Sequence, residues 1–139
     1  MVDVEVFARK VAMIRDAVAR IREVVPDTLE AFLVDRDARD IVALNLFVAL
    51  QETIALATHW LADAGLMVPS TYGDVFTRLA ESGVIDRGLG DRLRAAAGLR
   101  NLVAHQYGEL DFGRVHAVAR NELEDLLTFC RQLAERLDR

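Results

Sequence analysis

Hydrophobic residues recur every three or four positions along most of this chain, the spacing at which side chains share one face of an α-helix. The first such stretch runs from about Asp3 to Val25, and Pro26 ends it because the residue before a proline avoids helical dihedrals. Its apolar stripe consists of Val4, Phe7, Val11, Ile14, Val18, Ile21 and Val25. A short helix is expected to follow over 28–34.

Capping residues and glycines mark the ends of the remaining helices. The expected segments are 35–64, capped by Asp35 or Asp37 and ended by Gly65; 72–82, capped by Ser70 or Thr71 and ended by Gly83; 86–108, capped by Asp86 and ended by Gly108; and 112–138, capped by Asp111. No stretch alternates as a β-strand would. The pattern therefore predicts an all-α protein, an up-and-down bundle of four main helices plus short helices, in a single domain covering 1–139.

Charge and cysteine content narrow the range of functions. The net charge is −5 and the pI about 5.2, so the chain lacks the overall positive charge that non-specific binding of nucleic acid requires. The lone Cys130 excludes a disulfide within one chain and is expected to be a buried packing residue, so a reducing cytoplasm is expected. Asp3 and Glu5 do not resemble a signal peptide. The apolar stretch 41–68 contains enough polar residues to predict a buried helix and no membrane span.

The stretch 100–107, Arg-Asn-Leu-Val-Ala-His-Gln-Tyr, gathers the most chemically useful side chains of the chain. If the helix reaches Gly108, Arg100 and Tyr107 lie on nearly one line of it, with Asn101 and His105 on the adjacent line. All four side chains can then face one side, where a cation beside an imidazole can hold a phosphodiester and move a proton. The plainer alternative is an exposed helix end, with His105 as a favourable C-terminal cation.

This spacing resembles the motif of HEPN domains, in which an Arg, a polar residue and three further residues precede a His. The Tyr two residues after the His is similar to the HepT-like branch, and the resemblance extends over roughly 3–137. It implies a HEPN fold, a homodimer and a metal-independent endoribonuclease, the toxin of a type VII-like toxin–antitoxin pair. Arg100 and His105 would be the catalytic pair. Tyr107 would be the residue to which a nucleotidyltransferase antitoxin attaches AMP to silence the toxin; its alternative is a Tyr that packs over the helix end.

The chemistry of RNA cleavage fits these residue types. RNA carries its own nucleophile, the 2′-hydroxyl, so cleavage needs a base, a cation for the charged phosphorane and an acid for the leaving oxygen. His105 can be the base, Arg100 can donate to the phosphate oxygens, and Asn101 can orient the pair or the phosphate. One chain offers no second acid, which a two-fold dimer would supply. The competing hypothesis is a non-catalytic helical dimer that docks a nucleotidyltransferase.

Other polar residues are expected to be structural. Asn45, Glu52, His59 and Asp63 form a polar stripe that predicts a solvated face or a dimer seam, although Glu52 or Gln51 could instead orient Arg100. His116 is expected on the surface. The tripeptide 111–113 is expected to cap a helix, because the strands that surround a kinase Asp-Phe-Gly are missing. No glycine-rich phosphate loop or metal-ligand spacing occurs, so no cofactor or metal is expected.

Overall fold

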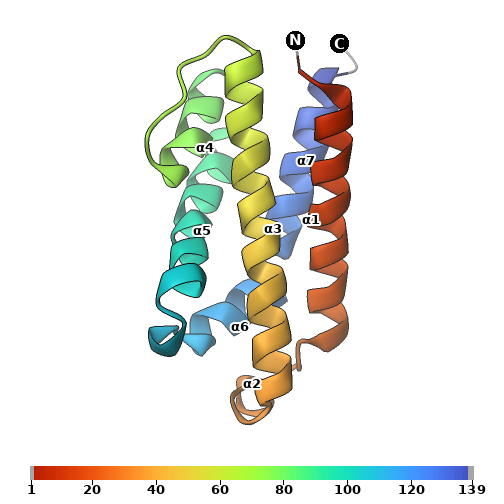
Figure 1. Cartoon of the computed structure of the whole chain (residues 1–139), viewed down its shortest axis with the longest axis vertical. Coiled ribbons are helices and arrows are strands. Elements are labelled where there is room, and N and C mark those ends of the chain that lie inside the picture. Colours follow the sequence, from red (N-terminus) through yellow and green to blue (C-terminus); the bar gives the residue numbers. More distant parts are fainter. Residues whose placement is uncertain (1, 138–139) are drawn as a thin grey trace.

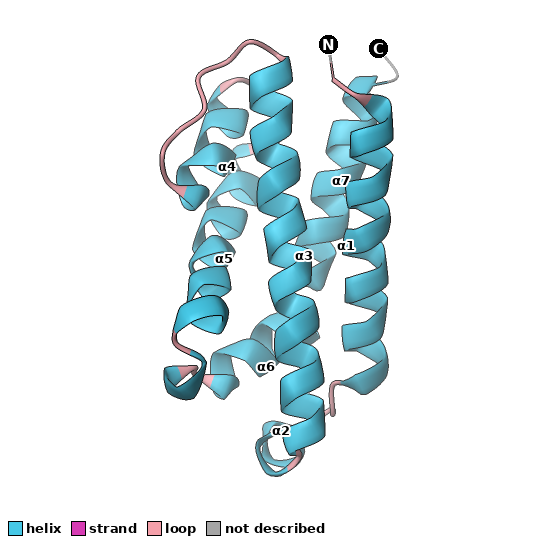
Figure 2. Cartoon of the chain, viewed as in Figure 1, coloured by secondary structure: helices cyan, strands magenta, loops and turns pink. Residues whose placement is uncertain are grey.

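The computed structural model describes residues 2–137, and within that range every regular element is helical (Figures 1 and 2). The elements in chain order are α1 (Val4–Val24), α2 (Leu29–Val34), α3 (Arg36–Asp63), α4 (Tyr72–Glu81), α5 (Arg87–His105), the 3-10 turn η1 (Tyr107–Glu109), α6 (Phe112–Asn121) and α7 (Leu123–Leu137). The predicted all-α bundle of long and short helices is confirmed.

The long helix α3 is the centre of the bundle. In Figure 1 it stands between α1 and α7 on one side and α4 and α5 on the other, and it contacts all four of these helices as well as α2 and α6. Its buried side chains are Ala38, Val42, Ala43, Leu46, Ala49, Leu50, Thr53, Ile54, Leu56, Ala57, Trp60 and Leu61. By length and composition alone α3 could cross a membrane, yet half of its most apolar window is buried in the bundle, as expected for a core helix.

Short polar side chains and glycines set the helix ends much as predicted. The carboxylates of Asp35, Asp86 and Asp111 each accept a hydrogen bond from a backbone N–H of the helix that follows. Gly65 and Gly83, with φ of 75° and 77°, follow α3 and α4 in the left-handed conformation that favours glycine. These local signals are strong because each acts within one helical turn.

Two boundaries differ from the prediction. The helix α5 ends at His105 and not at Gly108, because Gln106 leaves helical geometry with φ −137° and ψ 41°. The expected helix over 112–138 is two helices, separated at Glu122, whose φ of −121° and ψ of 0° break the axis. In Figure 1, α6 crosses the end of the bundle while α7 runs alongside α1. The apolar spacing continues through the break, so periodicity alone could not reveal it.

The prediction that His116 lies on the surface is wrong. Only 9% of the residue is exposed, and its Nε2 lies 2.8 Å from the carbonyl oxygen of Pro26. The imidazole also packs 5.3 Å from the ring of Phe32. Because α6 turns across the end of the bundle, its inward face meets the chain between α1 and α2. Cys130 is buried as predicted, and burial raises the pKa of its thiol to about 11.

We expect His116→Ala to lower the free energy of unfolding by about 2 kcal/mol, because it removes ring packing and leaves the Pro26 carbonyl without its partner. His59→Ala, at an exposed position of α3, is the matched control and should change stability by less than about 0.5 kcal/mol. Urea unfolding followed by circular dichroism measures both. Equal stability of the two variants would show that the His116 contacts contribute nothing.

Candidate active site

Arg100 is held in place by three elements of the bundle. Its Nε donates to Oε1 of Gln51 on α3 at 2.7 Å, and its Nη1 donates to Oδ1 of neighbouring Asn101 at 2.8 Å. The guanidinium lies over the ring of Phe47, 5.2 Å from its centre, and over the ring of Tyr72, 5.0 Å from its centre. Amide oxygens and aromatic faces orient a guanidinium without cancelling its charge.

The positive charge of Arg100 therefore stays available for an anion. Within residues 2–137 the guanidinium forms no ion pair with a carboxylate. The sequence offered Gln51 and Glu52 of α3 as partners of Arg100, and Gln51 is the one that accepts its hydrogen bond. Glu52 is turned toward α1 and pairs with Nζ of Lys10 at 2.8 Å. A carboxylate at position 51 would have neutralised the guanidinium, whereas an amide positions it.

Arg100, Asn101 and His105 come together along one open groove of about 370 Å³. Its remaining lining residues are Tyr72, Gly98, Leu102 and Gln106. His105 is exposed in the last turn of α5, and no hydrogen bond to its ring is found among the described residues. The groove thus offers a fixed cation, an amide and a solvent-accessible imidazole. We call it the Arg100 groove.

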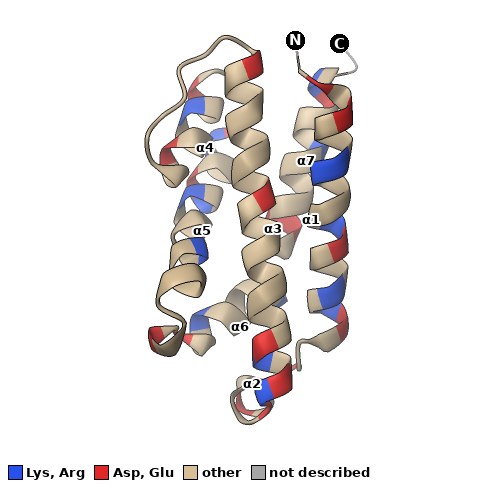
Figure 3. Ribbon diagram, viewed as in Figure 1, with Lys and Arg blue, Asp and Glu red and all other residues tan. Residues whose placement is uncertain are grey.

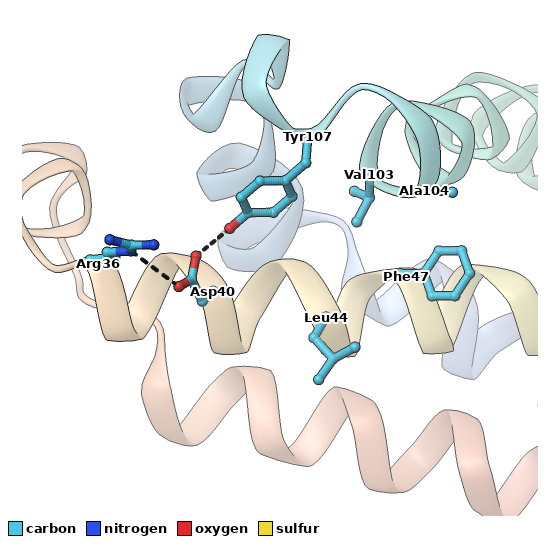
Figure 4. Close-up of a pocket in the computed structure, with 7 residues that line it drawn as sticks. All are labelled: Arg36, Asp40, Leu44, Phe47, Val103, Ala104 and Tyr107. Atoms are coloured by element: carbon cyan, nitrogen blue, oxygen red, sulfur yellow. Dashed lines mark hydrogen bonds and ion pairs between the residues drawn. The ribbon is translucent and has the colours of Figure 1, made fainter.

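Tyr107 does not share this groove, so the expectation that all four residues face one side is wrong. The helix α5 ends at His105, so Gln106 and Tyr107 are no longer helical continuations of it. The chain turns at Gln106, and the Tyr107 side chain faces α3 (Figure 4). There its hydroxyl donates a hydrogen bond to Oδ1 of Asp40, whose Oδ2 lies 3.6 Å from Nε of Arg36. The ring rests edge-on against Phe112, with ring centres 5.7 Å apart.

A second open groove, of about 540 Å³, lies in front of this phenol; we call it the Tyr107 groove (Figure 4). It is lined by Arg36, Asp40, Leu44, Phe47, Val103, Ala104 and Tyr107. Phe47 connects the two grooves, because it lines this one while its ring lies under the guanidinium of Arg100. The two grooves are therefore linked through the contact between the Phe47 ring and the Arg100 guanidinium.

The surroundings of Tyr107 disfavour its ionised form. Burial, the hydrogen bond to Asp40 and the negative charge of Asp40 together raise the pKa of Tyr107 to about 12. The cations Arg39 and Arg36 oppose this shift without overcoming it. At neutral pH the phenol is consequently protonated and acts as a hydrogen-bond donor.

Several residues of these grooves were not predicted from the sequence, among them Asp40, Phe47 and Tyr72. Each is far from the motif along the chain, and only the packing of α3 and α4 against α5 brings it there. A signal for two of them exists in retrospect, since Asp40 and Phe47 share one line of α3 with Gln51. As for metals, the described residues contain no group of three or more His, Cys, Asp or Glu that could hold an ion.

Comparisons with known proteins agree with the motif. A family model described as "Ribonuclease HepT-like" matches residues 14–133. The mRNA nuclease HepT of Shewanella oneidensis is 34% identical over 125 residues, which cover 90% of this chain and 93% of that protein.

Solved structures give the same result. The tri-AMPylated HEPN toxin of Shewanella oneidensis, in complex with an MNT antitoxin, superposes with a TM-score of 0.86 at 32% identity, covering 97% of this chain and 99% of that one. A toxin–antitoxin complex with AMP-PNP gives a TM-score of 0.87 at 31% identity, covering 94% and 98%. The chain belongs to the HepT-like ribonuclease family.

Proposed function

We propose that this protein is the toxin of a toxin–antitoxin pair and cleaves RNA in the Arg100 groove. The observation that carries the proposal is the placement of Arg100 and His105 in one open groove, with the guanidinium oriented by Gln51 and not neutralised. Its membership of a ribonuclease family supports the same activity. We place this activity in the cytoplasm, where RNA and a reducing environment occur together.

The residues of the groove suit each step of the reaction. The 2′-hydroxyl of RNA attacks the adjacent phosphorus, the new P–O bond forms, and the bond to the 5′-oxygen of the next nucleotide breaks. Neutral His105 takes the proton of the hydroxyl, while Arg100 donates N–H groups to the two non-bridging oxygens as their charge grows. Asn101, held to Arg100 by a 2.8 Å hydrogen bond, keeps the guanidinium aligned or contacts the phosphate.

The leaving 5′-oxygen also needs a proton, and in the Arg100 groove His105 is the lining side chain suited to carry one. A second copy of the chain, with its own motif facing the first across a two-fold axis, would supply another imidazole. We therefore propose a homodimer whose active site uses residues of both chains.

The antitoxin in this proposal is a nucleotidyltransferase that attaches AMP to Tyr107. Its support is the tri-AMPylated relative in complex with an MNT antitoxin. In this chain Tyr107 lines an open groove and is 39% exposed, so an enzyme can approach it without unfolding the bundle. The net charge of −5 favours a second candidate, a helical dimer that docks the nucleotidyltransferase and cleaves nothing.

A cleavage assay in excess chelator tests the ribonuclease. We expect His105→Ala and Arg100→Ala each to reduce RNA cleavage by at least about 100-fold, because each removes a group that acts in the transition state. His59→Ala, at an exposed position of α3, is the matched control and should cleave as wild type does. Full cleavage by His105→Ala would remove His105 from the mechanism, and a wild-type protein without activity would favour the docking module.

The same two variants test the shared active site. Co-expressed His105→Ala and Arg100→Ala chains form mixed dimers in which one site keeps an intact His and an intact Arg from different chains. We expect these mixed dimers to regain activity over either parent. A monomer in sedimentation experiments that retains cleavage would contradict the dimeric site.

Two substitutions at Gln51 test separately how the orientation and the charge of Arg100 contribute to RNA cleavage. We expect Gln51→Leu to lower kcat about tenfold through loss of orientation, with little effect on KM. Gln51→Glu should instead weaken RNA binding by about tenfold or more, because it places a carboxylate against the guanidinium. Glu52→Gln, which alters the neighbouring residue on the α1 side, is the control. Identical kinetics for both Gln51 variants would show that the contact is incidental.

Tyr107→Phe separates cleavage from its regulation. We expect this variant to cleave RNA as wild type does, since its hydroxyl lies outside the Arg100 groove, and to gain no AMP from the nucleotidyltransferase and ATP. Tyr72→Phe is the matched control for modification, because 42% of Tyr72 and 39% of Tyr107 is exposed. Intact-mass spectrometry measures the modification. AMP on the Tyr107→Phe variant would place the modification elsewhere.

A further inference from the structure

Exposure does not distinguish the two tyrosines of this chain, but their hydroxyl groups have different surroundings. Tyr72 and Tyr107 are about equally exposed, at 42% and 39%. The ring of Tyr72 lies under Arg100, and within residues 2–137 its hydroxyl has no hydrogen-bond partner. The hydroxyl of Tyr107 donates to the carboxylate of Asp40. Only Tyr107 therefore has a proton acceptor already in contact.

This acceptor is held in a defined orientation. Asp40 projects from α3 with one carboxylate oxygen on the Tyr107 hydroxyl and the other 3.6 Å from Nε of Arg36, one helical turn earlier (Figure 4). Phe112 fixes the other side of the phenol ring by an edge contact. About half of the Asp40 side chain is exposed, so the carboxylate can receive a proton and later release it to water.

Transfer of AMP to a phenol requires that the phenol lose its proton as its oxygen bonds to phosphorus. With a pKa of about 12, roughly one Tyr107 in 10⁵ is ionised at neutral pH. Spontaneous ionisation is thus a poor source of the nucleophile. A carboxylate in hydrogen-bond contact can instead take the proton as the new bond forms.

We propose that Asp40 is the base that activates Tyr107, so that the toxin itself supplies a catalytic residue for its own modification. The proposal rests on the proposed function, in which a nucleotidyltransferase brings ATP to Tyr107. The Tyr107 oxygen attacks the α-phosphorus and an O–P bond forms. The bond from the α-phosphorus to the oxygen that bridges it to the β-phosphorus breaks, pyrophosphate leaves, and the phenol proton goes to Asp40.

The nearby cations suit this step. The charged groups that act on the phenol are Asp40, Arg36 and Arg39, all on α3, whereas α6 presents the uncharged ring of Phe112. While Asp40 is ionised, Arg36 pairs with it. Once Asp40 is protonated its charge is gone, and Arg36 lies free beside the new phosphodiester, whose negative charge it can pair with.

The same hydrogen bond has an opposite interpretation, in which Asp40 restrains Tyr107 and slows its modification. The two interpretations predict opposite results when the carboxylate is removed. If Asp40 acts as a base, loss of its carboxylate slows the transfer of AMP to Tyr107. If Asp40 restrains Tyr107, loss of this restraint speeds the transfer. Asp40→Asn keeps the shape of the side chain and can still accept the hydrogen bond, but it cannot take the proton. A base therefore predicts slower transfer in this variant, whereas a restraint predicts a rate at or above that of wild type.

The experiment measures the rate of AMP attachment by intact mass, using the full chain, ATP with Mg²⁺ and an MNT-type nucleotidyltransferase antitoxin. We expect Asp40→Asn to slow the reaction at pH 7 by about 100-fold or more. Its rate should then rise about tenfold per pH unit up to pH 9, because hydroxide must replace the base. Wild type and Asp37→Asn, an exposed aspartate one turn earlier on α3, should show no such slope.

The outcomes separate the two levels of the argument. A wild-type chain that gains no AMP would remove the nucleotidyltransferase from the proposed function, and the role of Asp40 with it. Modification of Asp40→Asn at or above the wild-type rate would overturn the role of Asp40 alone. A slowed rate without the pH slope would also overturn it, because a loss of shape lowers the rate equally at every pH.

A titration without any partner checks the contact itself. In a Tyr72→Phe background, tyrosinate absorbance reports only Tyr107. Asp40→Asn should lower the pKa of Tyr107 from about 12, because Asn can still accept the hydrogen bond but lacks the negative charge that helps to raise this pKa. Burial, the largest cause, remains, so the pKa should stay above the ordinary 10.0. An unchanged titration would show that the carboxylate is not on the hydroxyl in solution.

Discussion

One line of side chains along α3 holds both grooves together. Asp40, Leu44, Phe47 and Gln51 follow one another at four, three and four residues, so they share the face that α3 turns toward α5. From one end to the other, this line supplies the acceptor for the Tyr107 hydroxyl, two apolar groove residues and the acceptor for the Arg100 guanidinium. Because α3 is packed on several sides, the line cannot rotate without disrupting the core.

That constraint explains how an acidic protein can present a cation to RNA. Acidic and basic residues are interspersed along the helices (Figure 3), and the long-range field of a chain with net charge −5 repels a polyanion, but salt screens such fields beyond about 10 Å. At short range the charge that matters is that of Arg100, and its neighbours Gln51, Asn101, Phe47 and Tyr72 are all uncharged. On the other side of α3, Glu52 is paired with Lys10 and turned away. The arrangement keeps carboxylates off the guanidinium that contacts phosphate in the proposed mechanism.

The sequence alone was sufficient for several relations that are contained in one helix. The caps at Asp35, Asp86 and Asp111, and the joint placement of Arg100, Asn101 and His105, follow from residues within two turns of each other. Tyr107 was misplaced because the helical line was extended past its last helical residue. Two further facts depend on tertiary packing: the burial of His116, which follows from the direction of α6 after the 3-10 turn, and the contact between Asp40 and Tyr107.

The corrected position of Tyr107 changes how its modification would silence the toxin. If all four motif residues shared one groove, a single AMP would occupy the place of the RNA phosphate directly. In the structure the hydroxyl contacts Asp40 on α3, and Tyr107 lines a different groove from Arg100 and His105. Phe47 lines the Tyr107 groove and its ring lies under the guanidinium of Arg100. An AMP on Tyr107 would therefore begin in the neighbouring groove and reach Arg100 only by extending past that ring. Its own phosphate charge acts across this short separation, but occupation of the Arg100 groove depends on how far the attached nucleotide extends. In the proposed regulation, the number of nucleotides added, and not only the presence of one, would then determine how completely RNA is excluded.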